Sequence, residues 1–292
     1  MNIKDIVKSL SDERWNIGFI SNDLDSIMLG EPIKVNWVKH HYKDSWFADP
    51  FILDITDEEI IVLVEEWYKP IKRGRISKLT IDRATFVLKD LRVILELNTH
   101  LSFPVIERRD DGIYIYPENG EAGNLSIYKY NPDTNECIKT GVLCEDAVAD
   151  AICTDFFGNK MMFATKRPNP NGNTLCIYEW AENSHKYIDK EQIKFEENVA
   201  RMAGNFFEYK GDVYRPTQEC NVQYGHAVTI QNVKNQDGKF SFEEVRRMYS
   251  VNKKLTVGMH TFNMYKGMIV TDALGFDRMW IRRILKTVGL LH

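Results

Sequence analysis

The chain has 292 residues, of which 43% are hydrophobic and 12% aromatic, and its formal net charge at pH 7 is −4. This length suits one large all-β domain. The slightly negative net charge argues against a nucleic-acid-binding protein, which typically has an excess of basic residues. The five cysteines lack CxxC spacing, so we expect reduced thiols rather than a disulfide framework or a zinc site. Charges interrupt every long apolar run, so we expect no membrane-spanning helix, no secretory signal and a cytoplasmic location.

Short segments rich in β-branched and aromatic residues, separated by Gly, Asp, Asn or Pro, predict strands along most of the chain. Five similar units follow one another, and each has an opening strand, a turn and a second apolar strand that ends on a polar residue. They cover residues 48–66, 102–118, 149–166, 204–219 and 260–273. Their spacing of roughly 50 residues suits a four-stranded blade. The sequence therefore predicts an all-β, five-bladed β-propeller that occupies residues 1–292 as a single domain.

The two ends of the chain complete this prediction. The last unit is short of strands, and the segment "WNIGFISND" (15–23) is expected to close the ring with an N-terminal strand. Residues 276–292 form a basic amphipathic tail that predicts a short C-terminal helix. Two interpretations stay open for it: peripheral contact with an anionic membrane through 278–291, or a closing strand followed by a docked helix.

In a propeller the first strand of each blade lines the central axis, so polar residues at equivalent positions are candidates for a site. The residues that open these strands are Asp49, Ser102, Asp150, Asn205 and His260. The residues that close the neighbouring strands are Glu66, Glu118, Lys166, Gln218 and Asp272. Each of them alone is equally typical of an ordinary turn. Their recurrence favours a polar ring at one mouth of the axis.

Carboxylates that converge from different blades suit glycosyl transfer, in which one group stays ionised and another donates a proton. Asp49 is the candidate for the ionised nucleophile or base, and Glu118 is its acid partner. Asp150 is expected to tune their pKa values or to hold a sugar hydroxyl. Glu66, His260 and Asp272 are candidates for substrate binding, although a single histidine is as often a core residue.

Two further segments carry candidate substrate-binding residues. "VYRPTQECNVQYG" (213–225) offers Arg215, Gln218 and Tyr224 to sugar hydroxyls or a phosphate, or else is a blade strand followed by a turn. Arg167 in "ATKRPNPNGN" could bind a diphosphate or lie on a solvated edge. The sequence contains no Gly-rich phosphate loop, so we expect no cofactor, with a nucleotide sugar as a candidate donor substrate. No cluster has metal-ligand spacing, so no residue is assigned as a metal ligand, and the sequence does not decide whether an ion lies in the channel.

The segments "WNIGFI", "WFADPFI", "HLSFPVI", "YPENG", "RPTQEC" and "GMHTFN" occur in an order that resembles the N-terminal propeller domain of plant glucosamine inositolphosphorylceramide transferases and its stand-alone bacterial relatives. More distantly, they are similar to five-bladed furanosidases and arabinanases. This resemblance implies that Asp49 is a general base, Asp150 a later blade-opening aspartate and His260 the channel histidine. "LSFP" stands where the glycosidases have an aspartate, so the resemblance implies the fold more strongly than the activity.

These observations together favour a glycosyltransferase of surface-polysaccharide or glycolipid assembly that uses a sugar donor and a glycan or glycolipid acceptor. The resemblance to glycosidases leaves a glycoside hydrolase of the five-bladed type as the first alternative. A non-catalytic glycan-binding propeller is the second alternative.

Overall fold

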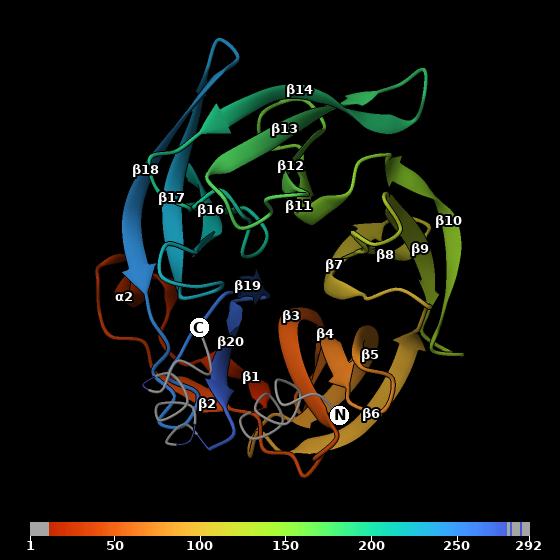
Figure 1. Cartoon of the computed structure of the whole chain (residues 1–292), viewed down its shortest axis with the longest axis vertical. Helices are drawn as coiled ribbons and strands as arrows, with labels where there is room; N and C mark the ends of the chain where they lie inside the picture. The colour runs from red at the N-terminus through yellow and green to blue at the C-terminus, as the bar shows by residue number, and fades with distance from the viewer. Residues whose placement is uncertain (1–11, 279–280, 282–286, 288–292) are drawn as a thin grey trace.

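The computed structural model describes residues 12–278, 281 and 287. Across them, the strands pair into five four-stranded antiparallel sheets that stand around a common axis (Figure 1). The fold is a five-bladed β-propeller, which confirms the prediction from the repeat. Each predicted unit supplies the two inner strands of one blade.

The blades follow one another along the chain. The first contains β3 (Ser45–Ile55), β4 (Glu59–Tyr68), β5 (Arg73–Asp82) and β6 (Leu88–Leu95). The second contains β7 (Ser102–Arg109), β8 (Gly112–Glu118), β9 (Leu125–Asn131) and β10 (Glu136–Cys144). The third contains β11 (Val148–Thr154), β12 (Met161–Lys166), β13 (Thr174–Ala181) and β14 (Lys186–Lys194). The fourth contains β15 (Phe207–Tyr209), β16 (Asp212–Glu219), β17 (Ala227–Gln236) and β18 (Lys239–Met248).

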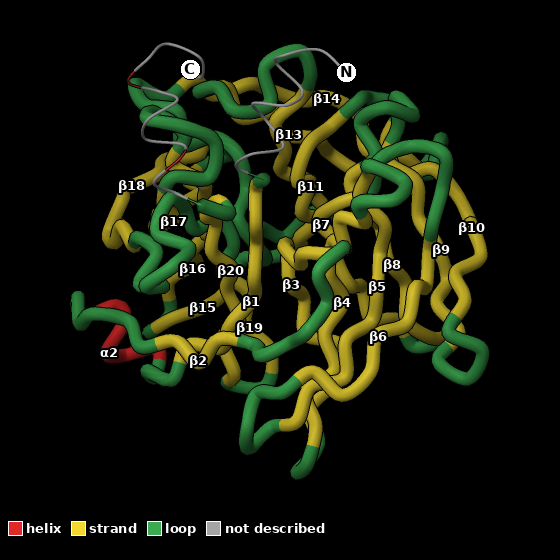
Figure 2. Tube along the Cα trace, turned by 60° about the horizontal axis from the view of Figure 1, so that its bottom comes forward, coloured by secondary structure: helices red, strands yellow, loops and turns green. Residues whose placement is uncertain are grey.

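The fifth blade is built from both ends of the described chain. Its strands, from the axis outward, are β19 (Phe262–Tyr265), β20 (Met268–Phe276), β1 (Glu13–Ile20) and β2 (Val35–Trp37). β1 pairs with β20 along its whole length, from Glu13 opposite Phe276 to Ile20 opposite Ile269. This pairing confirms the predicted closure by an N-terminal strand and removes the free edge of β20. A short helix, α2 (Leu24–Met28), connects β1 to β2 and is drawn red beside β2 in Figure 2.

Apolar side chains fill the spaces between neighbouring blades, so both faces of the inner strands are buried. On β4, Val62 and Val64 pack in a cluster with Ile17 and Phe19 of β1, whereas Leu63 packs in a cluster with residues of the second blade. Alternation along a strand sends successive side chains to opposite faces. This is why β4 reads as a continuous apolar run and not as an alternating one.

The predicted C-terminal helix and basic tail lie outside the described residues, except for residues 276–278, 281 and 287. Within the part of the chain that is described, no helix is long and apolar enough to cross a membrane.

Candidate functional site

The inner strands of the first three blades share one local irregularity. Their ladders shift register between Ala48 and Phe51, between Ser102 and Val105, and between Ala149 and Ile152. A residue with positive φ lies inside each shift: Asp49 (51°), Phe103 (46°) and Asp150 (46°). Such bulges bend a strand and redirect a side chain. The residue of the second blade that is equivalent to Asp49 is therefore Phe103, one position beyond the predicted Ser102.

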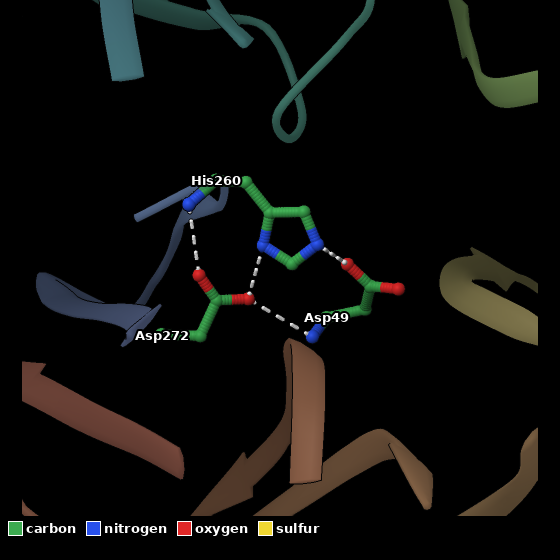
Figure 3. Close-up of side chains that lie close together, drawn as sticks. All are labelled: Asp49, His260 and Asp272. Carbon is green, nitrogen blue, oxygen red and sulfur yellow. Dashed lines mark hydrogen bonds and ion pairs between the residues drawn. The ribbon is translucent and has the colours of Figure 1, made fainter. Parts of the chain in front are cut away.

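Asp49, His260 and Asp272 form a buried triad in which the imidazole lies between two carboxylates (Figure 3). His260 Nε2 lies 3.2 Å from Asp49 Oδ1, and its Nδ1 lies 2.7 Å from Asp272 Oδ2. Asp272 also accepts hydrogen bonds from three backbone N–H groups, those of Asp49, His260 and Thr261. These bonds tie the inner strand of the first blade to the last blade, which explains how residues more than 200 positions apart share one site.

The triad carries its own cation. Burial by itself lowers the pKa of His260, but the carboxylates of Asp272 and Asp49 outweigh burial and raise it to about 9. The charge of His260 in turn lowers the pKa of Asp272 against the effect of burial. One ligand atom from each of the three residues lies within 4.8 Å of the others, a spacing that a metal ion could use. A raised pKa favours the protonated imidazole, whose two ring nitrogens each face a carboxylate.

A second cluster joins Asp150 and Glu118 through Arg201. Arg201 Nε lies 2.6 Å from Asp150 Oδ2, and its Nη2 lies 3.0 Å from Glu118 Oε2. Gln218 Nε2 donates to the same Asp150 oxygen at 2.5 Å. Burial raises the pKa of Glu118 to about 8, although the charge of Arg201 opposes this shift. The carboxylates outweigh burial at Arg201 and raise its pKa well above its usual value, so it remains a cation.

The sequence interpretation missed Arg201. It precedes the fourth predicted unit in the segment "NVARMAG" (198–204), where it is the one charge in an apolar run. A charged residue in an apolar run indicates a buried charge that is paired with another group. The sequence does not show that the partners of Arg201 are two carboxylates from other blades.

Glu66 is held by side chains of its own blade. Glu66 accepts hydrogen bonds from Ser45 Oγ, Ser77 Oγ and Arg75, so internal partners hold both of its carboxylate oxygens. Glu65 lies on the opposite face of β4, across from Ala48 of β3, and is also buried. The role of Glu66 in substrate binding stays a prediction.

Arg215 is also not part of the cluster at the axis. Its side chain is completely buried, with the rings of Phe195 and Phe242 4.6–5.1 Å away. It donates two hydrogen bonds to Gln231 Oε1 and one each to the carbonyl oxygens of Val199 and Ala200. The prediction that Arg215 contacts a sugar or phosphate does not fit this burial. The residue instead supports the segment that carries Arg201.

Aromatic rings surround the triad. The ring of Trp15, from β1, lies 4.1 Å from the imidazole of His260, and Tyr224 contacts the same imidazole edge-on at 5.2 Å. The guanidinium of Arg201 lies 5.1 Å from the ring of Tyr224. Trp15 was predicted only as part of the closing strand, because its distance in sequence from the other units hides its place at the axis.

Arg167 is exposed and lies against the loop that follows Glu118. A Cβ atom on Gly120 would come within 2.6 Å of Arg167 Nε, so glycine permits this close approach. Of the predicted site residues, the following meet around the axis: Asp49, Glu118, Asp150, Gln218, Tyr224, His260 and Asp272. Arg167 lies at their rim. The chemical roles assigned to them remain predictions.

Comparison with known proteins identifies the chain. A family model described as "Glucosamine inositolphosphorylceramide transferase 1, N-terminal" matches residues 32–272. The chain belongs to this family. The match confirms the resemblance on which the sequence prediction relied, and it includes all the axial residues except Trp15, which lies before it.

Two relatives of this N-terminal family show how much of a longer protein the chain represents. A glucosamine inositolphosphorylceramide transferase 1 of Oryza sativa subsp. japonica is 23% identical over 238 residues, which cover 78% of this chain and 31% of the rice protein. The protein of the same name from Arabidopsis thaliana is 24% identical over 203 residues, which cover 65% and 26% of the two chains. The chain thus spans less than a third of the length of these curated relatives.

Solved structures with the same architecture include two GH43 proteins. A β-xylosidase/α-arabinofuranosidase from a compost microbial metagenome superimposes with a TM-score of 0.55 and 9% identity, covering 81% of this chain and 92% of that one. A GH43_1 enzyme from Xanthomonas citri gives a TM-score of 0.53 and 8% identity, with coverage of 80% and 88%. At these identities the likeness establishes the five-bladed fold and nothing more.

Proposed function

We propose that this chain acts on carbohydrate and that its reaction is glycosyl transfer in the assembly of a surface polysaccharide or glycolipid. The observation that carries the proposal is a set of buried acceptor atoms at the axis. Asp150 Oδ1 and Gln218 Oε1 are buried, and no described residue donates a hydrogen bond to either. Buried acceptors normally have donors, and a sugar ring supplies several hydroxyl donors at once.

The carboxylates around these atoms suit chemistry at a glycosidic centre. They converge from four blades and comprise Asp49, Glu65, Glu118, Asp150 and Asp272. In the proposed reaction Asp49 acts as the ionised group. Burial raises the pKa of Asp49 well above its usual value, and the charge of His260 beside one carboxylate oxygen opposes that shift, while the other oxygen accepts a hydrogen bond from the N–H of Phe103. Glu118, with its pKa raised to about 8 by burial, still holds its proton at pH 7 and can donate it. Asp150 is fixed by Arg201 and orients the sugar.

The distribution of charge suggests how a nucleotide-sugar donor would be oriented. Arg201 and His260 at the axis are already paired with carboxylates, so neither is free to bind a diphosphate. Arg167 is the exposed cation at the rim, beside the loop that contains Gly120. The donor is therefore expected to place its diphosphate at Arg167 and its sugar inside. No organic cofactor is needed for this reaction.

The acceptor is proposed to be a glycan or glycolipid. The rice and Arabidopsis relatives are named as transferases that act on inositolphosphorylceramide, and the matched region is the N-terminal part of such proteins. A glycolipid acceptor for this chain is our extension of those names.

Glycoside hydrolysis is the second candidate. It is favoured by the same carboxylates and by the pairing of Arg201 and His260 with carboxylates, which leaves neither of these two cations free for a diphosphate. Against it stands Phe103, which brings a benzyl group to the position where the first and third blades have Asp49 and Asp150.

The test measures nucleotide release and sugar release by the wild type, Asp49→Asn and Asp54→Asn, each incubated with nucleotide sugars, with and without glycan acceptors. Asp54 lies on the same strand, β3, but is ion-paired to Lys266 at the surface, so its variant is the matched control. We expect acceptor-dependent nucleotide release that Asp49→Asn lowers by about 10²- to 10⁴-fold and Asp54→Asn leaves unchanged.

Other results would redirect or remove the proposal. Release of sugar from a glycan without any nucleotide donor would favour the hydrolase. Binding of glycans with equal strength by the wild type and Asp49→Asn, without turnover, would support a non-catalytic glycan-binding propeller.

A further inference from the structure

Four aromatic rings form a row that begins at the triad and continues outward over the first blade. It starts at Trp15 on β1, whose ring centroid lies 4.1 Å from that of His260. The ring of Trp46 on β3 lies 6.5 Å from Trp15 and 5.7 Å from Trp67 on β4. Trp67 in turn lies 5.8 Å from the ring of His100. The reaction proposed above gives no role to the outer members of this row, Trp46, Trp67 and His100.

We propose that the indoles of Trp46 and Trp67 form a subsite for a sugar ring of the glycan acceptor, and that Glu65 beside them accepts hydrogen bonds from its hydroxyl groups. The occupant is an uncharged glycan chain that extends from the axis over the first blade. Its role as acceptor rests on the proposed function, whereas the binding of a glycan at this place does not.

Trp46 and Trp67 combine partial exposure with a shared orientation. They are opposite one another in the β3–β4 ladder, so their side chains project from the same face of the blade. Their ring planes are parallel to within 6°, and both side chains are half-buried. One face of a sugar ring carries apolar C–H groups that pack against an aromatic ring, while polar groups nearby fix its orientation. Two parallel indoles next to the triad provide such an apolar surface.

Glu65 supplies the polar part of this subsite. It is two residues before Trp67 on β4, so its side chain projects from the same face. Glu65 is 6% exposed, and among the described residues no N–H or hydroxyl group donates an aligned hydrogen bond to it, although His100 Nε2 lies 3.4 Å from its Oε1. A buried carboxyl group normally has several hydrogen-bond partners. Glu65 therefore has acceptor capacity left for the hydroxyl groups of a ligand.

The backbone of β5 leaves room for this arrangement. Gly74 is opposite Trp67 in the β4–β5 ladder, so a side chain at this position would project from the same face. A Cβ atom on Gly74 would lie 2.7 Å from Glu65 Oε1, 2.7 Å from His100 Cε1 and 2.4 Å from the carbonyl oxygen of Leu101. Glycine therefore allows Glu65 and His100 to lie next to Trp67 and places no side chain of its own against the indole.

Charge distinguishes this subsite from the expected position of the diphosphate. Glu65 lies beside the row, and Glu13 accepts a hydrogen bond from Trp15 Nε1 at 2.6 Å. Burial lowers the pKa of His100, so its imidazole is neutral at pH 7. Carboxyl groups and a neutral imidazole disfavour a diphosphate and suit an uncharged sugar. The exposed cation Arg167 lies elsewhere, against the loop that follows Glu118.

The test is isothermal titration calorimetry of the full chain, without any nucleotide, with four uncharged oligosaccharides: cellohexaose, xylohexaose, mannohexaose and chitohexaose. We expect the wild type to bind at least one of them. Trp46→Ala and Trp67→Ala should each weaken that binding by about tenfold or more, because each removes an aromatic surface from the centre of the contact. Trp67→Tyr keeps a ring at the same position and should weaken it less.

Trp180→Ala is the matched control. Trp180 is also half-buried and packs on another ring, that of Tyr187 at 5.1 Å, but it lies on β13, the third strand of its blade counted from the axis. This variant is expected to bind the oligosaccharides as the wild type does. Thermal unfolding shows whether each variant is folded, and Trp67→Tyr answers the question if the alanine variants do not fold.

Equal binding by the wild type and both alanine variants would overturn the proposal, and so would the absence of binding to all four oligosaccharides. Tryptophan-dependent binding without acceptor-dependent nucleotide release would refute the transferase function and leave the subsite standing. Acceptor-dependent nucleotide release with a KM for the acceptor that neither tryptophan variant changes would leave the function standing and refute the subsite.

Discussion

At the axis of the ring, His260 lies between two carboxylates, and its titration is set by the balance of burial against their charges. Burial favours the neutral ring, whereas Asp272 and Asp49 favour the imidazolium, and the net result is a pKa of about 9. A histidine in an unfolded chain titrates near 6.5. The folded protein therefore binds this proton more tightly than the unfolded chain does.

This difference predicts how stability depends on pH. The stabilisation from His260 is fully present below about pH 6.5 and is lost as pH rises through 9, because the folded state then loses its tighter proton. We expect the wild type to lose stability relative to His260→Gln between these values, by at most on the order of 3 kcal/mol. Urea unfolding of both proteins from pH 6 to 10 checks this, and parallel stability curves would contradict it.

The sequence located the blade-opening residue correctly in the first and third blades. In the second blade it placed this residue one position too early. Asp49 and Asp150, which the sequence analysis chose as blade-opening residues, both lie inside a bulge at the equivalent position of their blades, and both side chains are buried at the axis. Ser102 was chosen in place of Phe103, because the bulge on β7 shifts the inward-facing position by one residue. No propensity in a single sequence marks a bulge of this kind, so the side of the strand that faces the axis is left open.

At the scale of elements, β1 gives the fifth blade its third strand and a large part of its packing. Ile17 is completely buried and packs with Val62 and Val64 of the first blade. Trp15 on the same strand reaches the ring of His260. The N-terminal strand therefore contributes both to closure of the ring and to the site.

Truncating a buried side chain of β1 should therefore lower the free energy of unfolding as much as truncating a residue in the middle of the core. We expect Ile17→Ala to lower the free energy of unfolding by about 2–5 kcal/mol, because it leaves a cavity between two blades. Val93→Ala on the outer strand β6, where the valine is 38% exposed, is the control and should change stability by less than about 0.5 kcal/mol. Chemical denaturation measures both, and an equally small effect for Ile17→Ala would mean that β1 is not packed in solution.

Across the whole molecule, Arg201 connects separate blades at the axis. Its guanidinium binds Asp150 of the third blade and Glu118 of the second, and it donates to Asn171 in the loop between β12 and β13. Arg215 in turn holds the carbonyl oxygens of the segment from which Arg201 projects. The site is therefore assembled only when neighbouring blades have docked.

Replacing Arg201, which connects the second and third blades, should lower the free energy of unfolding strongly. Arg201→Met leaves Asp150 and Glu118 buried without their cation, and we expect a loss of about 3–5 kcal/mol in the free energy of unfolding. Arg247 also pairs with two carboxylates, Glu197 and Glu244, but at the surface, so Arg247→Met should cost about 0–1 kcal/mol. Urea denaturation of the two variants makes the comparison, and equal losses would show that Arg201 is no more important than a surface ion pair.

The sequence by itself determined the number of blades, the closing strand and the presence of carboxylates at the axis, because strand patterns and repeats are local properties that recur along the chain. Tertiary structure alone decided which carboxyl groups meet and what charge each carries. His260 and Asp272 reach Asp49 only when the last blade packs against the first, and Arg201 and Trp15 reach the axis only when five blades close into a ring. The pKa values of His260, Glu118 and Arg201 depend on burial and on charges from other strands and blades, which no local pattern encodes.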